Sequence, residues 1–167
     1  RFITFVPEID MPGHSAAFTR AMGFDMQSEQ GMKVCKEIIN EICSELDIPY
    51  LHVGGDEVTI RNKEFLPEMS RTVIAAGKKV IAWNPGGNVL EGTMLQMWNG
   101  NTVTKPGFPS IDSRHLYLNH FDPFDGVTVV FNHKICDVDS GNKFNLGATL
   151  CNWPDRKVNK EEDLIRF

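Results

Sequence analysis

The chain has 167 residues, with 17 lysines and arginines against 22 aspartates and glutamates, so its formal net charge is −5. Hydrophobic residues make up 41% and charged residues 23%, which is typical of a globular protein and excludes a low-complexity or disordered chain. The acidic balance argues against the positive surface that binds nucleic acid or an anionic membrane, so we expect no nucleic-acid partner. No run of about 18 apolar residues occurs, which excludes a membrane-spanning helix in this segment.

Short runs of β-branched and aromatic residues predict six strands. They are residues 2–6, 50–53, 79–83, 94–98, 115–118 and 146–151. After the first of these runs, apolar residues repeat at helical spacing from Ser28 to Leu46, opposite a charged face, and Ser28 is a suitable N-cap for a helix. Residues 99–114 are rich in glycine and proline and predict an irregular connection.

A second helix is predicted from about Asn62 to Ala76, with Gly77 as the left-handed residue that ends it. Pro67 fits a helix only near the first turn, so the helix can begin later than Asn62. Alternating strands and helices predict an α/β fold with a parallel sheet. A complete (β/α)8 barrel takes about 250 residues, so a barrel of this length would be truncated.

The four cysteines form no CxxC pair, which argues against a zinc ribbon. Cys35 and Cys43 would lie about 12 Å apart along one helix, which is too far for a disulfide. Cys136 and Cys151 stay a candidate disulfide pair, so the redox compartment is left open.

Polar and aromatic residues gather at the end of nearly every predicted strand. The carboxyl ends of parallel strands form the active face of α/β barrels, so this distribution is typical of a barrel enzyme. The segments concerned are Pro7–His14, His52–Glu57, Trp83–Asn84, Trp98–Asn99, Tyr117–Asn119 and Trp153–Asp155.

The adjacent carboxylates Asp56 and Glu57 are the sharpest of these features. On a regular strand they would point to opposite faces, but Gly54 and Gly55 before them allow a bend that turns both toward one pocket. Two carboxylates held close repel each other, so the pKa of one rises and that group can serve as a general acid. A solvated turn after the strand is the plain alternative.

The segments Pro7–His14, with the sequence PEIDMPGH, and His52–Glu57, with the sequence HVGGDE, closely resemble the two signatures of glycoside hydrolase family 20, the β-N-acetylhexosaminidases. The later aromatic residues follow in the order that this family uses for its substrate pocket. The resemblance implies that residues 1–167 form one partial catalytic domain of TIM-barrel type, from about the third strand to the eighth. It also implies a parent protein that is exported, although the sequence itself does not set the compartment.

The resemblance implies a substrate-assisted, retaining mechanism on glycans that contain N-acetylglucosamine (GlcNAc) or N-acetylgalactosamine (GalNAc). Glu57 would protonate the leaving oxygen and later act as base toward water, while the 2-acetamido oxygen of the substrate attacks the anomeric carbon. Asp56 would hold the acetamido N–H, and Tyr117 would donate a hydrogen bond to the acetamido oxygen. This chemistry needs no cofactor and no metal.

The same resemblance gives expectations for the groups around these three. The indoles of Trp83, Trp98 and Trp153 would wall the pocket, since pyranose rings present apolar C–H faces to aromatics. Asp155 and Asn119 would bind sugar hydroxyls. Two further side chains, His14 and Asp10, would orient Glu57 and tune its proton affinity.

The chain departs from the family pattern in several places. Asn84 and Asn119 stand where acidic residues are frequent, and Asp155 stands where glutamate is common. The first two barrel strands, with the arginine that binds the sugar, have no counterpart, and the chain starts inside a strand pattern without an initiator methionine. We therefore expect a piece of a longer chain, with open sheet edges that would favour self-association.

Three other functions stay open from the sequence. A glycosidase that releases a disaccharide would use the same motifs. A carbohydrate-binding relic without activity would fit a truncated domain. A metal hydrolase could use Asp10, His14, Asp56 and Glu57, whose side chains suit a divalent cation.

Overall fold

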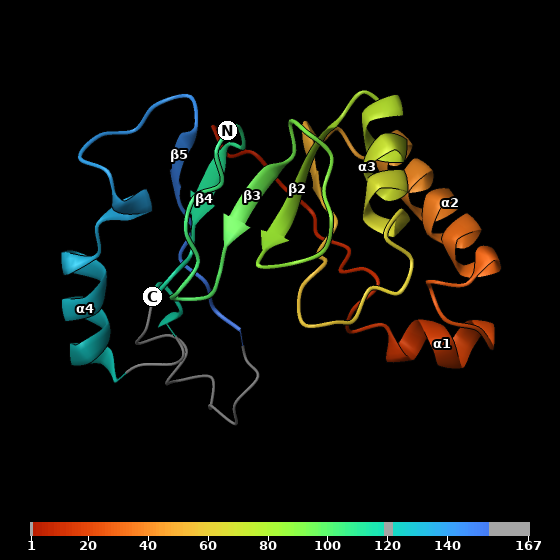
Figure 1. Cartoon of the computed structure of the whole chain (residues 1–167), viewed down its shortest axis with the longest axis horizontal. Helices are drawn as coiled ribbons and strands as arrows, with labels where there is room; N and C mark the ends of the chain where they lie inside the picture. The colour runs from red at the N-terminus through yellow and green to blue at the C-terminus, as the bar shows by residue number, and fades with distance from the viewer. Residues whose placement is uncertain (1, 119–121, 154–167) are drawn as a thin grey trace. The chain divides into compact units, whose positions relative to one another are not determined.

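The structure is a computed structural model that describes residues 2–118 and 122–153. It divides into two compact units, residues 1–95 and 96–167, and each is described by itself. The first unit contains α1 (Ala16–Met22), α2 (Glu29–Glu45), β1 (Tyr50–His52), α3 (Phe65–Ala75) and β2 (Lys79–Asn84) (Figure 1). Strand β3 (Met94–Met97) contains the boundary between the units and confirms the strand predicted at 94–98.

Parallel strand pairing organises the first unit, as predicted. β1 pairs in parallel with β2, with Leu51 opposite Val80. On its other side, β1 meets the segment that carries the PEIDMPGH sequence through a parallel bridge between Glu8 and His52. The strand predicted at residues 2–6 is wrong, because the backbone hydrogen bonds to β1 begin only at Pro7, and Phe2 and Ile3 are exposed.

Both predicted helices of the first unit are confirmed. The Ser28 hydroxyl accepts a hydrogen bond from the Gly31 N–H and caps α2. Pro67 lies in the first turn of α3, so that helix begins later than Asn62, and Gly77 follows it with a φ of 77°. The short helix α1 was not predicted.

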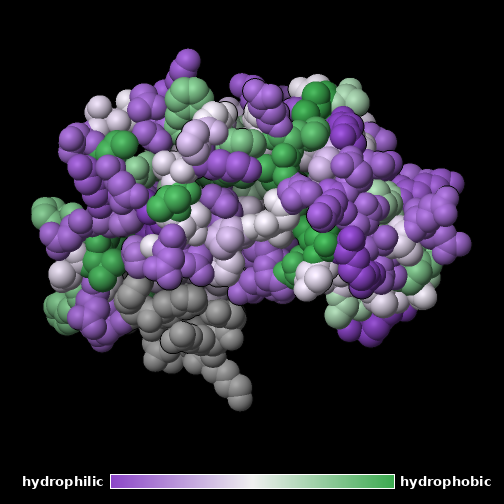
Figure 2. Space-filling model, in the orientation of Figure 1, coloured by the Kyte–Doolittle hydropathy of each residue, from purple (hydrophilic) through white to green (hydrophobic). Residues whose placement is uncertain are grey.

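The core of the first unit lies between these helices and the strands. Helix α3 packs against α2 and against β2 (Figure 1). The opposite side of α2 faces solvent, and the surface over this helix is mostly hydrophilic (Figure 2). The packed side chains are fully buried and include Cys35, Ile39, Leu51, Val53, Phe65, Met69 and Val73. This core fixes the helices against the end of the sheet that carries the polar segments.

The second unit contains β4 (Ser110–Asp112), α4 (Pro123–Asn132), the 3₁₀ turn η2 (Ile135–Asp137) and β5 (Asn145–Ala148). β4 pairs in parallel with β5, which confirms the strand predicted at 146–151 with earlier bounds. Helix α4 was not predicted, although Asp122 caps it by accepting from the Phe124 N–H. No helix within the described residues has both the length and the apolar character of a membrane span.

The strand predicted at residues 115–118 is wrong. The strand of this region is β4, inside the segment that the sequence indicated to be irregular. The Asp112 carboxylate accepts from the Arg114 N–H and so turns the chain at the end of β4. Beyond this turn, Tyr117 forms an isolated parallel bridge with Cys151, which lies outside the named strands.

A buried ion-pair network anchors the end of β4. Asp112 is fully buried and accepts from the Arg114 guanidinium at 2.8 and 3.0 Å, from His133 at 3.0 Å and from the Cys136 N–H at 2.7 Å. Burial alone would raise the pKa of Asp112, but these donors outweigh it and lower that pKa to about 2. Cys136 carries a free thiol, so its predicted disulfide with Cys151 is not formed.

Candidate active site

The PEIDMPGH segment reaches the end of β1 through backbone hydrogen bonds. The His52 N–H donates to the Pro7 carbonyl at 2.9 Å, and the Met11 N–H donates to the Val53 carbonyl at 3.3 Å. This pairing places Asp10 beside Gly54, which has a φ of 68°. A Cβ atom on Gly54 would lie 1.9 Å from Asp10 Oδ1, so only glycine permits this close approach. The two signature segments are therefore brought together by the sheet.

Asp10 connects the two segments through both of its oxygens. Its Oδ1 accepts from the Gly55 N–H at 3.1 Å, and its Oδ2 pairs with His14 Nδ1. The other ring nitrogen of His14, Nε2, lies 3.3 Å from Glu57 Oε2. The hydrogen bond to Asp10 raises the pKa of His14, although partial burial opposes this, and nearby Asp56 and Glu57 raise it further. The predicted grouping of Asp10 and His14 with Glu57 is thus present in the structure.

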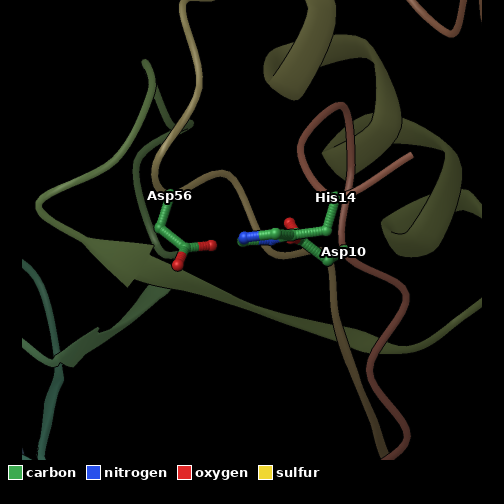
Figure 3. A group of neighbouring side chains, drawn as sticks. All are labelled: Asp10, His14 and Asp56. Carbon is green, nitrogen blue, oxygen red and sulfur yellow. The ribbon is translucent and has the colours of Figure 1, made fainter. Parts of the chain in front are cut away.

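Asp56 lies on the other side of the same imidazole. Figure 3 shows the His14 ring between the Asp10 and Asp56 carboxyl groups. Burial raises the pKa of Asp56, and the charge of Asp10 adds to this effect. Its Oδ1 is buried and has no hydrogen-bond partner among the residues that the structure describes. Such an oxygen is suited to accept a hydrogen bond from a ligand.

Two residues of the site have strained backbone conformations. His14 has a φ of 45° and Glu57 a φ of 49°, in the left-handed region that residues other than glycine rarely adopt. Strained residues of this kind cluster at functional sites, because the surrounding structure has to hold them there. The Glu57 side chain is 55% exposed, so a ligand can reach its carboxylate.

Trp83, at the end of β2, lies in the same unit and is 5% exposed. Its Nε1–H donates to Glu8 Oε1 at 2.6 Å, and its ring contacts the His52 ring at a centroid distance of 4.7 Å. Burial raises the pKa of Glu8 to about 7, despite the hydrogen bond from Trp83, and burial lowers the pKa of His52 to about 3. The sequence indicated no separate role for Glu8, although its place inside the PEIDMPGH segment was an available signal.

The other predicted site residues belong to the second unit or lie outside the described residues. Trp98 and Tyr117 are partly buried, and Trp153 is 43% exposed. Asn119 and Asp155 lie outside the described residues. The predicted roles of these five residues therefore stay predictions.

Asp10, His14 and Asp56 each offer one ligand atom, and these atoms lie within 4.8 Å of one another. A divalent cation could use such a set, as the metal hydrolase alternative requires. However, His14 Nδ1 already pairs with Asp10, and Asp10 also accepts from the Gly55 N–H. These contacts give the carboxylate and the imidazole an organised arrangement that does not depend on an ion.

The chain is similar in sequence to known β-hexosaminidases. No protein-family model matches the chain. The chain is 29% identical over 133 residues to a β-N-acetylhexosaminidase of Cellulomonas fimi, a match that covers 64% of this chain and 27% of that protein. It is 24% identical to β-hexosaminidase A of Caenorhabditis briggsae, with 72% of this chain and 33% of that protein covered. The chain thus spans about a third, or less, of the length of these curated relatives.

Solved structures show the same fold. The exo-β-N-acetylglucosaminidase of Vibrio harveyi from glycoside hydrolase family 20, in complex with N-acetylglucosamine, superposes with a TM-score of 0.77 at 17% identity and covers 99% of this chain and 37% of that chain. A β-N-acetylhexosaminidase of Bacteroides fragilis gives a TM-score of 0.71 at 22% identity, over 92% of this chain and 42% of that chain. The predicted fold class, an α/β domain of the barrel type, is therefore confirmed.

Proposed function

We propose that this chain, which is similar to β-N-acetylhexosaminidases, carries the catalytic carboxylates of a glycosidase that removes terminal β-linked GlcNAc or GalNAc. The arrangement of Asp56 and Glu57 around His14, at the end of β1, is the observation that carries this proposal. The related Vibrio harveyi enzyme was solved with N-acetylglucosamine, which supports the sugar class.

In the proposed reaction, the Glu57 carboxyl group gives its proton to the glycosidic oxygen as the bond from that oxygen to the anomeric carbon breaks. The acetamido oxygen of the substrate forms a new bond to the anomeric carbon, which produces an oxazolinium ion. Asp56 accepts a hydrogen bond from the acetamido N–H and stabilises the positive charge of the oxazolinium ion. Its Oδ1, which has no partner among the described residues, is available for this hydrogen bond. Glu57 then removes a proton from a water molecule, whose oxygen bonds to the anomeric carbon as the bond from that carbon to the acetamido oxygen breaks. Glu57 thereby regains its proton, and the product retains its configuration.

Asp10 and His14 support the acid in this scheme. When His14 Nδ1–H donates to Asp10, its Nε2 faces the Glu57 carboxyl group at 3.3 Å. The imidazole can share a proton with Glu57 through that nitrogen, and so hold the carboxyl group in one orientation during both steps. The raised pKa of His14 is consistent with a ring that lies among carboxylates.

The proposal also gives roles to the residues that are expected to surround the sugar. Trp83, Trp98 and Trp153 would contact the sugar and the acetyl methyl group, and Tyr117 would donate to the acetamido oxygen. Asn119 and Asp155 would contact sugar hydroxyls. Release of a disaccharide, sugar binding without hydrolysis and metal hydrolysis are less favoured, because no observation on the described residues favours them over the exo-glycosidase.

The test compares Glu57→Gln with Glu41→Gln in the full-length protein. Glu41 is an exposed glutamate of α2, so its substitution is a matched control. We expect E57Q to lower the rate on a chitobiose substrate by about 10²–10⁴-fold while the affinity for GlcNAc stays close to wild type. Wild-type rates in E57Q would refute the assignment of the acid, and equal rates on glucosides and GlcNAc glycosides would refute the substrate-assisted mechanism.

A further inference from the structure

Glu8 has no place in the mechanism above, yet its side chain is three-quarters buried beside the pocket residues, with 25% of its surface exposed. Its carboxylate accepts the 2.6 Å hydrogen bond from Trp83 Nε1, across 75 positions of sequence. An indole nitrogen can only donate, so a buried tryptophan needs an acceptor of this kind. At 2.6 Å the contact is shorter than most N–H···O bonds.

The Trp83 indole is held on a second side by His52. The two rings are in contact at 4.7 Å with an interplanar angle of 55°. The His52 ring is itself fixed, because its Nδ1 accepts from the Gly54 N–H at 3.1 Å and its surroundings are fully packed. The indole therefore contacts a buried, hydrogen-bonded ring, while its N–H donates to Glu8.

The position of Glu8 is set by the sheet and not by a flexible loop. Glu8 forms a parallel bridge with His52, and the hydrogen bonds of Pro7 and Ile9 to His52 lie on both sides of it. The backbone pairing of Glu8 with His52 therefore positions both side chains that contact the Trp83 indole, which are the His52 ring and the Glu8 carboxyl group. Residues on regular elements hold a site more precisely than residues on loops.

We propose that Glu8 is a positioning residue that fixes the orientation of the Trp83 indole, and thereby sets the selectivity of the pocket for the N-acyl group of the substrate. This inference rests on the proposed function, in which Trp83 forms part of the wall around the acetyl methyl group. A fixed indole gives that wall one shape, which fits acetyl and disfavours a longer acyl chain. An indole that can rotate would accept both.

The test uses Glu8→Gln and Glu8→Leu in the full-length protein. Glutamine keeps an acceptor oxygen without the charge, and leucine removes the acceptor. Glu64→Leu is the matched control, because the Glu64 carboxylate pairs with Arg71 at the surface and its side chain is 61% exposed. The first readout is the indole Nε1–H signal of Trp83 in a nitrogen–proton correlation spectrum, identified by its loss in Trp83→Phe.

The second readout is the ratio of kcat/KM for N-acetyl and N-propionyl glucosaminides. In E8L we expect the indole signal to move upfield and the ratio to fall roughly tenfold, mainly through a higher KM for the acetyl substrate. In E8Q we expect a smaller change in both, and in E64L none. Partial recovery in E8Q separates positioning of the indole from a general loss of folding.

Two results would overturn the inference. An indole signal that is unchanged in both E8Q and E8L would show that Glu8 does not hold Trp83. A moved signal with wild-type selectivity in an active enzyme would show that the contact does not set the pocket, while the proposed function would stand. If the wild-type protein hydrolysed neither substrate, the proposed function would fail, and the indole signal would still decide whether Glu8 positions Trp83.

Discussion

Replacing Asp10 by asparagine tests the central contact of the site at almost constant size. Asp10 accepts from the Gly55 N–H and pairs with His14 Nδ1, and asparagine can keep only one of these contacts with its single oxygen. A hydrogen bond to a charged group contributes about 1.5–3 kcal/mol, which corresponds to roughly ten- to a hundredfold in rate. The His14 side chain is 58% exposed, so solvent screening favours the lower end of that range.

We therefore expect Asp10→Asn to lower kcat/KM on a GlcNAc glycoside about tenfold, and to lower the pKa of His14. The sign follows from the hydrogen bond to Asp10, which is the largest cause of the raised pKa of His14. The imidazole of the variant should lose its proton at a lower pH than that of the wild type. Proton NMR titration of the His14 ring and the pH profile of kcat/KM measure both effects.

Asp47→Asn is the matched control, because Asp47 is exposed after the end of α2. It removes the same charge elsewhere in the first unit and should change neither quantity. A His14 pKa in D10N that equals or exceeds the wild-type value would refute the reasoning, since it would mean that Asp10 does not stabilise the charged ring.

Two further predictions concern backbone space and folding stability. Gly54→Ala should lower kcat/KM by about 10²-fold, because the new Cβ would lie 1.9 Å from Asp10 Oδ1 and displace it; retention of wild-type kinetics would contradict this. Asp112→Asn should lower the free energy of unfolding in urea by about 3 kcal/mol, because the buried Arg114 would keep the exposed carboxylate of Asp137 but lose its buried one, whereas Asp139→Asn at the surface should have little effect. Since the pKa of Asp112 is lowered to about 2, its contribution should be complete above about pH 4 and be lost as the pH falls toward 2.

Local sequence patterns predicted the elements whose stability is local. The Ser28 cap and the apolar repeat determine α2 almost to the residue, and Pro67 and Gly77 mark the start and end of α3. Residues 2–6 have the composition of a strand, but a strand also needs backbone groups that pair with a neighbour. The backbone hydrogen bonds between this segment and β1 begin only at Pro7. Composition alone cannot indicate that register.

Short elements and distant contacts were the parts that the sequence did not reveal. β4 has only three residues, too few for a periodic signal, and a side-chain turn at Asp112 ends it. The grouping of Asp56 and Glu57 with His14 could be predicted from the sequence, because both signature segments are long and follow each other in the order that the resembled family shows. The contact between Glu8 and Trp83 joins residues 75 positions apart, and no local pattern encodes such a partner.

The pairing of the PEIDMPGH segment with β1 explains why so many acidic groups share one end of the sheet. Carboxylates packed together repel, and the fold offsets this repulsion differently for each group. Glu8 is buried against Trp83 and has a raised pKa, whereas Asp10 accepts from a backbone N–H and from His14. Asp56 keeps an unpartnered oxygen. Because the partners differ, one backbone arrangement gives these carboxyl groups different surroundings, which in the proposed reaction would let an acid and an anion act side by side.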